Sequence, residues 1–133
     1  MRLLVVDDSA TERTLVARFL ANAGCRVETA VDGVEALEHF TNDPFDVVVC
    51  DCDMPRMGGL ELCRAIREHP AGTDTYLIML SGRDAAIARA QSITAGVDAF
   101  LTKPCSPPDL IKIVRAAEMM LAAPPIHTVR RAS

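Results

Sequence analysis

The strongest constraint on the fold is an alternation of short apolar runs with segments of helical periodicity. Apolar runs that predict strands occupy residues 3–6, 47–50, 76–80 and 99–102, and an alternation of polar and apolar residues at 25–30 predicts an edge strand. Helical spacing or helix-start signals cover residues 10–23, 32–40, 60–68, 84–95 and 107–121. Strands that alternate with helices form parallel βαβ units. We therefore predict an α/β three-layer sandwich, with a five-stranded parallel sheet covered by helices on both faces.

Local signals define the ends of the first helix. The stretch from Ser9 to Glu12, read SATE, is typical of a capping box, in which Ser9 caps the helix and the Glu12 carboxylate reaches back. Gly24 is placed to end this helix. The apolar stripe that starts at Leu15 predicts the buried face.

Composition limits the class of protein. The chain has 133 residues, of which half are hydrophobic, so it suits a single domain with one core. Its net charge is -4 and its pI is near 5.3, which argues against direct binding to nucleic acid. No apolar run reaches the length of a membrane span, and the start MRLLVVDDSA does not resemble a signal peptide. We expect a cytoplasmic domain over residues 1–121, followed at 122–133 by a tail or the start of a linker.

Five cysteines lie at positions 25, 50, 52, 63 and 105. Their odd number and the absence of a C-x-x-C pair argue against a disulfide framework and a zinc knuckle. Cys52, which stands beside two acids, is the candidate for a reactive thiol; the other cysteines are expected to be reduced and structural.

Polar residues follow four of the five predicted strands. These strands lead into Asp7 and Asp8, Asp51, Ser81 and Lys103, whereas the second strand ends in apolar residues. In open α/β sheets, ligands bind at the carboxyl ends of the strands, where the strand order reverses. A strand order of 2-1-3-4-5 would move the second strand to the edge and bring the other four ends together.

Each of these residues has a simpler explanation when taken alone. The aspartates and the serine suit helix caps or turns, and a single lysine is usually a solvated charge. Their coincidence at one edge favours a site instead. Carboxylates that close together either stay partly protonated or hold a cation among them, and for a cation the oxygen-only ligand set suits magnesium. With Lys103 and a hydroxyl nearby, these functional groups are the ones that phosphoryl transfer to a carboxylate requires.

The motifs VVDDS, DCDMPRMGG, MLSG and FLTKP, in this order, resemble those of the receiver domain of two-component response regulators. The resemblance covers about residues 1–121 and implies a flavodoxin-like fold. It implies that Asp51 is the phosphoacceptor and that Asp7 and Asp8 hold Mg²⁺, or Mn²⁺ in its place, together with Asp51. The backbone carbonyl of Asp53 would be a further metal ligand.

The resemblance assigns roles to four residues of the last two motifs. Ser81 would be the switch hydroxyl, and Phe100 the aromatic residue whose rotamer follows it. Lys103 would form the salt bridge to the phosphoacceptor, and the bond between Lys103 and Pro104 would be cis.

The resemblance also implies partners. A histidine kinase or a histidine phosphotransfer protein would donate the phosphoryl group, and the surface of the fourth helix, fifth strand and last helix would contact an effector domain or protein. The domain would catalyse only its own phosphorylation and dephosphorylation, so we do not expect an enzyme with a separate substrate. A phosphorylation-dependent homodimer stays open, and no contact with a membrane or nucleic acid is expected.

Two charged residues depart from the usual pattern beside the pocket. Asp53 stands two residues after Asp51, and Arg83 stands two residues after Ser81. We hypothesise that Asp53 and Arg83 form an ion pair across the mouth of the pocket and restrict attack by water. The alternative is that both are solvated charges of little consequence.

Three rival functions are compatible with parts of the sequence. A phosphohydrolase of the haloacid dehalogenase type would use Asp51 and Asp53, but the acidic pair here precedes the nucleophile and no cap domain is available. A nucleotide-binding module would need glycines in the loop after the first strand, where Asp7 and Asp8 stand instead. The third rival is a receiver fold that docks partners without being phosphorylated.

Overall fold

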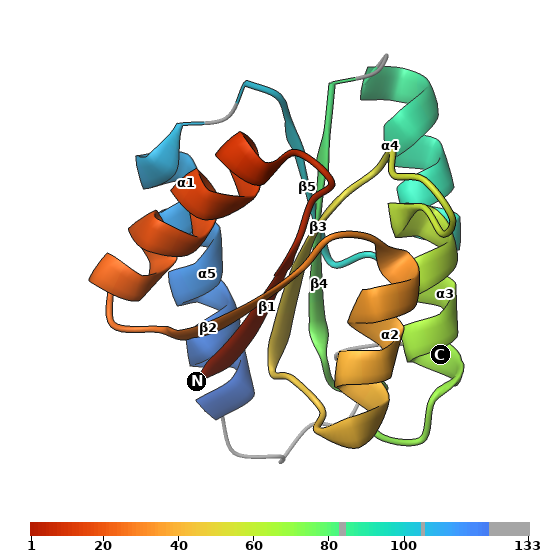
Figure 1. Ribbon diagram of the computed structural model, residues 1–133, viewed down its shortest axis with the longest axis horizontal. Helices are drawn as coiled ribbons and strands as arrows, with labels where there is room; N and C mark the ends of the chain where they lie inside the picture. Colours follow the sequence, from red (N-terminus) through yellow and green to blue (C-terminus); the bar gives the residue numbers. More distant parts are fainter. Residues whose placement is uncertain (83–84, 105, 123–133) are drawn as a thin grey trace.

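The computed structural model describes residues 1–82, 85–104 and 106–122, which form an alternating series of strands and helices (Figure 1). The elements are β1 (Arg2–Val6), α1 (Ala10–Asn22), β2 (Arg26–Ala30), α2 (Gly33–Asn42), β3 (Val47–Asp51), α3 (Gly59–Glu68), β4 (Tyr76–Ser81), α4 (Ala85–Thr94), β5 (Ala99–Thr102) and α5 (Pro107–Ala122). All strand pairs are parallel, in the order β2-β1-β3-β4-β5. The predicted fold and strand order are therefore confirmed.

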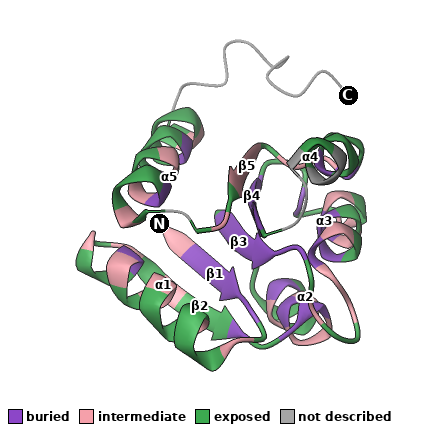
Figure 2. Ribbon diagram, turned by 90° about the horizontal axis from the view of Figure 1, so that it is seen from above, coloured by how far each residue is buried: buried purple, intermediate pink, exposed green. Residues whose placement is uncertain are grey.

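Two apolar clusters cover the two faces of the sheet. Alternate residues of β1 enter different clusters: Leu3 and Val5 pack with α1 and α5, while Leu4 and Val6 pack with α2 and α3. This division follows from the two-residue period of a strand. Figure 2 shows the buried central strands between the two helical layers. Because both faces are covered, β3 is buried along its whole length.

The second strand lies at the edge of the sheet and is largely exposed, as its polar and apolar alternation predicts. It pairs with β1 alone, from Arg2 opposite Arg26 to Val6 opposite Ala30. The ends of β1, β3, β4 and β5 are consequently adjacent, and these are the four strands that lead into polar residues.

The start of α1 differs from the predicted capping box. Ser9 caps the helix as expected, because its hydroxyl accepts a hydrogen bond from the backbone N–H of Glu12 at 3.3 Å. The carboxylate of Glu12 does not reach back, since the N–H of Ser9 donates to Asp7 Oδ1 at 2.9 Å. Glu12 instead pairs with Lys103. The predicted cap by the Ser9 hydroxyl is confirmed, and the predicted contact of the Glu12 carboxylate with the N–H of Ser9 is wrong.

The predicted apolar stripe of α1 is only partly buried. Leu20 is fully buried, but the side of the helix that carries Leu15 faces outward, and Leu15 is 50% exposed. Gly24 follows the end of the helix with a φ of 95°, a left-handed conformation that glycine adopts without the Cβ penalty. Its predicted role as a helix stop is confirmed.

An ion pair joins the loop after β3 to the start of α2. Asp32 caps α2 by accepting from the N–H of Glu35 at 2.9 Å, and its second oxygen accepts from Arg56 Nε at 2.7 Å. Arg56 has a φ of 65°, which is uncommon for a residue with a side chain. The adjacent backbone reinforces the link, because the N–H of Gly33 donates to the carbonyl of Met57 at 3.0 Å.

The cysteines among the described residues form no disulfide. Cys50, Cys52 and Cys63 are buried in the cluster under α2 and α3, and this burial argues against the reactive thiol predicted at Cys52. The hydrogen bond with Cys63, followed by burial, raises the pKa of Cys50.

The last helix continues through Ala122, one residue into the segment predicted as a tail. The rest of that segment, residues 123–133, lies outside the described residues. Within residues 1–82, 85–104 and 106–122, none of the helices combines the length and apolarity needed to cross a lipid bilayer.

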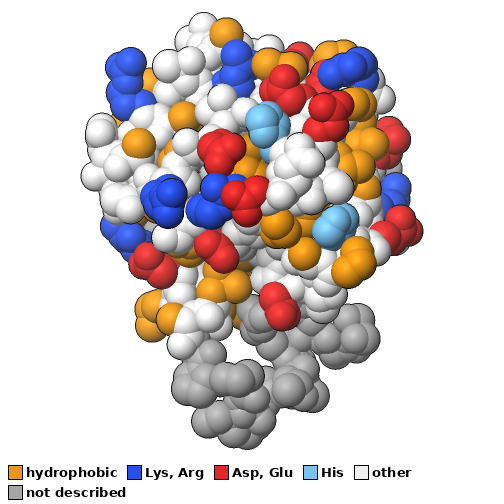
Figure 3. All heavy atoms as spheres, turned by 60° about the horizontal axis from the view of Figure 1, so that its bottom comes forward, with side chains coloured by type: hydrophobic (Ala, Val, Ile, Leu, Met, Phe, Trp, Pro, Cys, Tyr) orange, Lys and Arg blue, Asp and Glu red, His pale blue; other side chains and the backbone are white. Residues whose placement is uncertain are grey.

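The face at the amino ends of the strands carries intermixed acidic and basic side chains (Figure 3). Arg2 pairs there with Glu28 at 2.8 Å and with Asp43 at 3.2 Å, and its guanidinium lies 4.3 Å from the centre of the Phe45 ring. These contacts anchor the start of β1 and leave the carboxyl edge of the sheet to the site residues.

Candidate functional site

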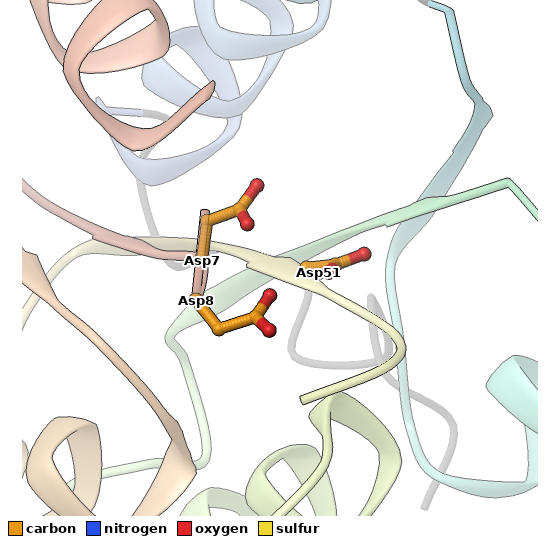
Figure 4. A group of neighbouring side chains, drawn as sticks. All are labelled: Asp7, Asp8 and Asp51. Atoms are coloured by element: carbon orange, nitrogen blue, oxygen red, sulfur yellow. The ribbon is translucent and has the colours of Figure 1, made fainter. Parts of the chain in front are cut away.

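Three aspartates meet where β1 and β3 end. Asp7 and Asp8 directly follow β1, and Asp51 is the last residue of β3. Because Val6 pairs with Cys50, the next residue on each strand continues the same register. One carboxylate oxygen from each aspartate lies within 4.8 Å of the other two (Figure 4). The structure thus brings together the three acids that the sequence singled out.

Burial makes this cluster electrostatically unfavourable. Asp7 and Asp51 are buried, whereas Asp8 is exposed. Loss of hydration raises the pKa of Asp7 despite a hydrogen bond from Ser9 and the charge of Lys103. Loss of hydration likewise raises the pKa of Asp51, although Lys103 and a hydrogen bond from the N–H of Asp53 oppose the shift. Carboxylates that resist ionisation in this way are expected at a site that binds a cation.

Lys103 supplies the positive charge at the site. Its Nζ lies 3.0 Å from Glu12 Oε2, 3.2 Å from Asp51 Oδ1 and 3.5 Å from Asp7 Oδ2. Partial burial acts to lower the pKa of Lys103, but the hydrogen bond that its ammonium donates to Glu12 and the charges of the two aspartates outweigh burial and raise it. The ammonium group therefore stays charged, and the predicted contact between Lys103 and Asp51 is confirmed.

The backbone around Lys103 agrees with the sequence expectations. The peptide bond between Lys103 and Pro104 is cis, as predicted. The N–H of Lys103 donates to the carbonyl of Ser81 at 2.7 Å, which continues the pairing of β4 with β5 beyond Thr102. Ser81 is fully buried at the end of β4, one residue after Leu80, the partner of Asp51 in the sheet. The predicted switch residue therefore stands next to the acceptor strand.

Phe100 lies on β5, half-buried against the cluster under α2, α3 and α4. The guanidinium of Arg89, on α4, is 5.0 Å from the centre of its ring. A cation over an aromatic face at this distance is a favourable contact. The side chain of Phe100 therefore connects β5 to α4.

Gly59 allows the chain to turn back beside the acceptor. A Cβ atom at this position would overlap the carbonyl oxygen of Asp51 and lie 3.0 Å from Met79 Sδ. The N–H of Gly59 also donates to the carbonyl of Cys52 at 3.0 Å, which closes the loop after β3. The absence of a side chain here keeps Asp51 at its place on the sheet edge.

Only one member of the predicted ion pair between Asp53 and Arg83 lies among the described residues. Asp53 lines a cavity of about 410 Å³ together with Asp8 and Arg56, on the side of the loop after β3. Arg83 lies outside the described residues, so the ion pair stays a prediction.

The residues at the strand ends fit a magnesium ion. All the side-chain donors are carboxylate oxygens, the spacing of Asp7, Asp8 and Asp51 lets them share one small ion, and the cavity beside Asp8 leaves room for water. Within the part of the chain that the structure describes, this is the only group of acids, histidines and cysteines close enough to hold a metal.

Sequence reasoning missed two features of the site. Glu12 was interpreted as a helix cap, yet its carboxylate is the shortest ionic contact of Lys103, which lies 91 residues away in the chain. Arg56 was not singled out, although it ties the loop after Asp51 to Asp32. An acid in the first turn of a helix that starts at the sheet edge was the available signal for Glu12.

Comparison with known proteins identifies the family. Residues 3–115 match the response regulator receiver domain, and the chain belongs to that family. It is similar to the response regulator MprA of Mycobacterium avium, with 41% identity over 116 residues, which cover 87% of this chain and 50% of that protein. The MprA protein of Mycobacterium leprae is equally similar. The chain thus spans about half the length of the curated relatives it matches.

Solved structures support the same family. The chemotaxis protein CheY4 of Vibrio cholerae is 34% identical with a TM-score of 0.83, and the match covers 87% of this chain and 97% of that one. The receiver domain of a histidine kinase from Syntrophus aciditrophicus is 26% identical with a TM-score of 0.86, covering 97% and 98%. Membership of this family argues against the haloacid dehalogenase and nucleotide-binding alternatives.

Proposed function

We propose that this receiver domain accepts a phosphoryl group on Asp51 from a phosphohistidine of a histidine kinase or phosphotransfer protein. The reaction depends on magnesium, or on manganese in its place. The observation that carries the proposal is the arrangement of charge at the sheet edge: three aspartate oxygens within 4.8 Å of one another and the Lys103 ammonium 3.2 Å from Asp51.

Asp51 acts as the nucleophile. One of its carboxylate oxygens forms the new bond to phosphorus while the bond from phosphorus to the histidine nitrogen breaks, and the nitrogen keeps the electron pair. Lys103 is placed to neutralise charge on the phosphoryl oxygens. Asp7, Asp8, Asp51 and the backbone carbonyl of Asp53 would hold the magnesium ion, which when bound supplies further positive charge to the phosphoryl group.

The change at Asp51 then spreads to a partner surface through β4 and β5. Ser81, buried at the end of β4, turns toward the phosphoryl group, and Phe100 follows into the space that Ser81 leaves. Movement of Phe100 alters its contact with Arg89 of α4, since the two groups are 5.0 Å apart. A local charge thereby biases two conformations of the surface formed by α4, β5 and α5.

That surface contacts an effector domain or protein, and its altered conformation also favours a phosphorylated homodimer. The chain has no separate substrate and catalyses only its own phosphorylation and dephosphorylation. The curated relatives, named as response regulators, are about twice as long as the matched segment, which supports an effector in the complete protein.

Phosphorylation by a small donor tests the proposal. The protein is incubated with acetyl phosphate, with and without MgCl₂, and intact-mass spectrometry measures uptake of one phosphoryl group. Uptake is expected only with magnesium and is expected to be absent in Asp51→Asn. The variant Asp46→Asn is the matched control, because Asp46 directly precedes β3, at the end opposite Asp51, and its carboxylate accepts a hydrogen bond from the N–H of Arg2.

Each outcome discriminates between the candidate functions. Absence of uptake by the wild type would refute the proposal and favour a receiver that docks without phosphorylation. Uptake that persists in Asp51→Asn would place the acceptor elsewhere. Sustained release of phosphate from phosphomonoesters by pure protein would favour a hydrolase.

A further inference from the structure

Lys103 has more acidic partners than its proposed role requires. Asp51 is the acceptor and Asp7 belongs to the metal site, but Glu12 comes from α1 and takes part in neither function. Its Oε2 atom nevertheless lies 3.0 Å from Lys103 Nζ, closer than the oxygens of Asp51 at 3.2 Å and Asp7 at 3.5 Å. The closest partner of the lysine is therefore the one without an assigned role.

The hydrogen-bonding capacity of Lys103 is limited. An ammonium group has three N–H donors, and three carboxylates surround this one. A phosphoryl group on Asp51 brings additional oxygens that compete for the same donors. At least one carboxylate must therefore weaken its contact with Lys103 when the phosphoryl group arrives.

Glu12 is the partner that gives way at least cost. Its side chain is 50% exposed, whereas the side chains of Asp7 and Asp51 are 5% and 10% exposed. Water can replace Lys103 as the partner of an exposed carboxylate, but it cannot reach the buried aspartates to the same extent. Asp7 is also fixed by the hydrogen bond from the N–H of Ser9 at 2.9 Å.

The position of Glu12 places it at the entrance to the site. Together with Asp7, Leu15 and Lys103, it lines a cavity of about 370 Å³ between α1 and the segment that follows β5. A phosphoryl group bound to Lys103 would therefore meet the negative charge of Glu12 at close range. Competition for Lys103 and repulsion of the anion act in the same direction.

We propose that Glu12 is an exchangeable counter-ion of Lys103. The Glu12 carboxylate binds the Lys103 ammonium while Asp51 is unmodified, and it gives up this contact when a phosphoryl group on Asp51 takes its place. Glu12 is in this sense a positioning residue that restrains phosphorylation of Asp51. The proposal rests on the function proposed above and adds a residue that sets the rate of the reaction and the affinity for the phosphoryl group.

A structural role of Glu12 can be separated from this one. An acid in the first turn stabilises a helix through its dipole, so the variant Glu12→Gln is expected to leave the fold intact and its stability unchanged or slightly lower. The cap itself is made by the Ser9 hydroxyl, which the variant retains. A gain in phosphorylation would thus not follow from a more stable helix.

The test compares wild type with Glu12→Gln in saturating MgCl₂. The rate of phosphorylation by acetyl phosphate is measured by intact mass, and the affinity and release rate of beryllofluoride are measured by NMR. We expect phosphorylation about two to five times faster in the variant, tighter binding of beryllofluoride and its slower release, as is typical for one exposed ion pair. Because the effect is electrostatic, the difference between the two proteins should shrink as ionic strength rises.

Glu38→Gln provides the matched control, because Glu38 is an exposed acid on α2 and its change alters net charge equally. The control should behave as the wild type does. An unchanged or lower rate in Glu12→Gln, or a gain that does not fall with salt, would overturn the proposal. If the wild type neither takes up phosphate nor binds beryllofluoride, the proposed function fails instead, so the two failures are distinguishable.

Discussion

Replacement of Asp51 by asparagine should stabilise the metal-free protein against unfolding. Asparagine keeps the shape of the side chain and can still accept the hydrogen bond from the N–H of Asp53. It removes a buried negative charge from a cluster in which the oxygens of Asp7, Asp8 and Asp51 lie within 4.8 Å of one another. The substitution that abolishes the proposed function is thus expected to strengthen the fold.

The distances set the size of the effect. At an effective dielectric constant of about 20, two like charges 4.8 Å apart repel by roughly 3.5 kcal/mol, and Asp51 has two such neighbours. Its attraction to Lys103 at 3.2 Å is roughly 5 kcal/mol on the same scale. Two such repulsions exceed the attraction by only roughly 2 kcal/mol, and solvent around the exposed Asp8 reduces that difference. The burial of Asp51, which is the largest cause of its raised pKa, therefore decides the sign. We expect a gain of about 1 to 2 kcal/mol in the free energy of unfolding.

The gain should depend on pH and on magnesium. The pKa of Asp51 is raised in the folded state, so its ionisation opposes folding at neutral pH, and this penalty disappears as pH falls toward the unfolded value of about 3.9. Magnesium stabilises the wild type by mass action and relieves the same repulsion, while the variant loses a ligand. The difference should therefore narrow both in acid and in saturating MgCl₂.

Urea unfolding followed by far-UV circular dichroism measures these differences. Glu38→Gln is the control, since Glu38 is an exposed acid on α2 and lies outside the site. The electrostatic reasoning would be refuted if Asp51→Asn were no more stable than the wild type without metal at neutral pH. It would also be refuted if the gain were the same with and without magnesium.

Two further substitutions test how the loops around the site are held. Gly59→Ala should destabilise the protein by about 1 to 3 kcal/mol in urea unfolding and slow its phosphorylation, because the added Cβ overlaps the carbonyl of Asp51. Gly82→Ala is the control: its Cβ would meet no atom closer than 4.0 Å, so the free energy of unfolding should hardly change. Asp32→Asn should lower stability at neutral pH, since it retains the helix cap but loses the charge that pairs with Arg56. The pKa of Asp32 is lowered, chiefly by the hydrogen bond from Arg56. The contribution of this carboxylate to the free energy of unfolding is therefore present above about pH 3.9 and is lost as the pH falls. Equal stabilities of wild type and Asp32→Asn at neutral pH would contradict this.

The fold and most of the site could be predicted because each depends on local patterns. Apolar runs of four or five residues specify buried parallel strands, and the polar residue at the end of each run is carried to one edge by the fold itself. Asp51 and Lys103 are 52 positions apart in the sequence, yet both follow directly from this rule. The edge position of β2 followed from its apolar end in the same way.

Contacts between side chains of different elements could not be predicted in this way. Glu12 satisfied a local motif, and only the packing of α1 beside the end of β5 shows that its carboxylate lies on Lys103. Leu15 had the spacing of a buried residue but is half-exposed and lines the cavity beside Lys103. Arg56 pairs with Asp32 because two loops converge at the sheet edge, which no single segment encodes.

The charge balance at the sheet edge connects the roles of magnesium and Glu12. The described site holds one ammonium group and four carboxylates, those of Asp7, Asp8, Glu12 and Asp51, so it carries a net charge of three negative units. A phosphoryl donor is itself an anion, and such a site repels it until a dication reduces the excess to one negative unit. Neutralising Glu12 removes that last unit without touching a metal ligand. The glutamate should therefore affect the rate of phosphorylation most when magnesium is bound, whereas in the metal-free protein its removal leaves a site that still repels the donor.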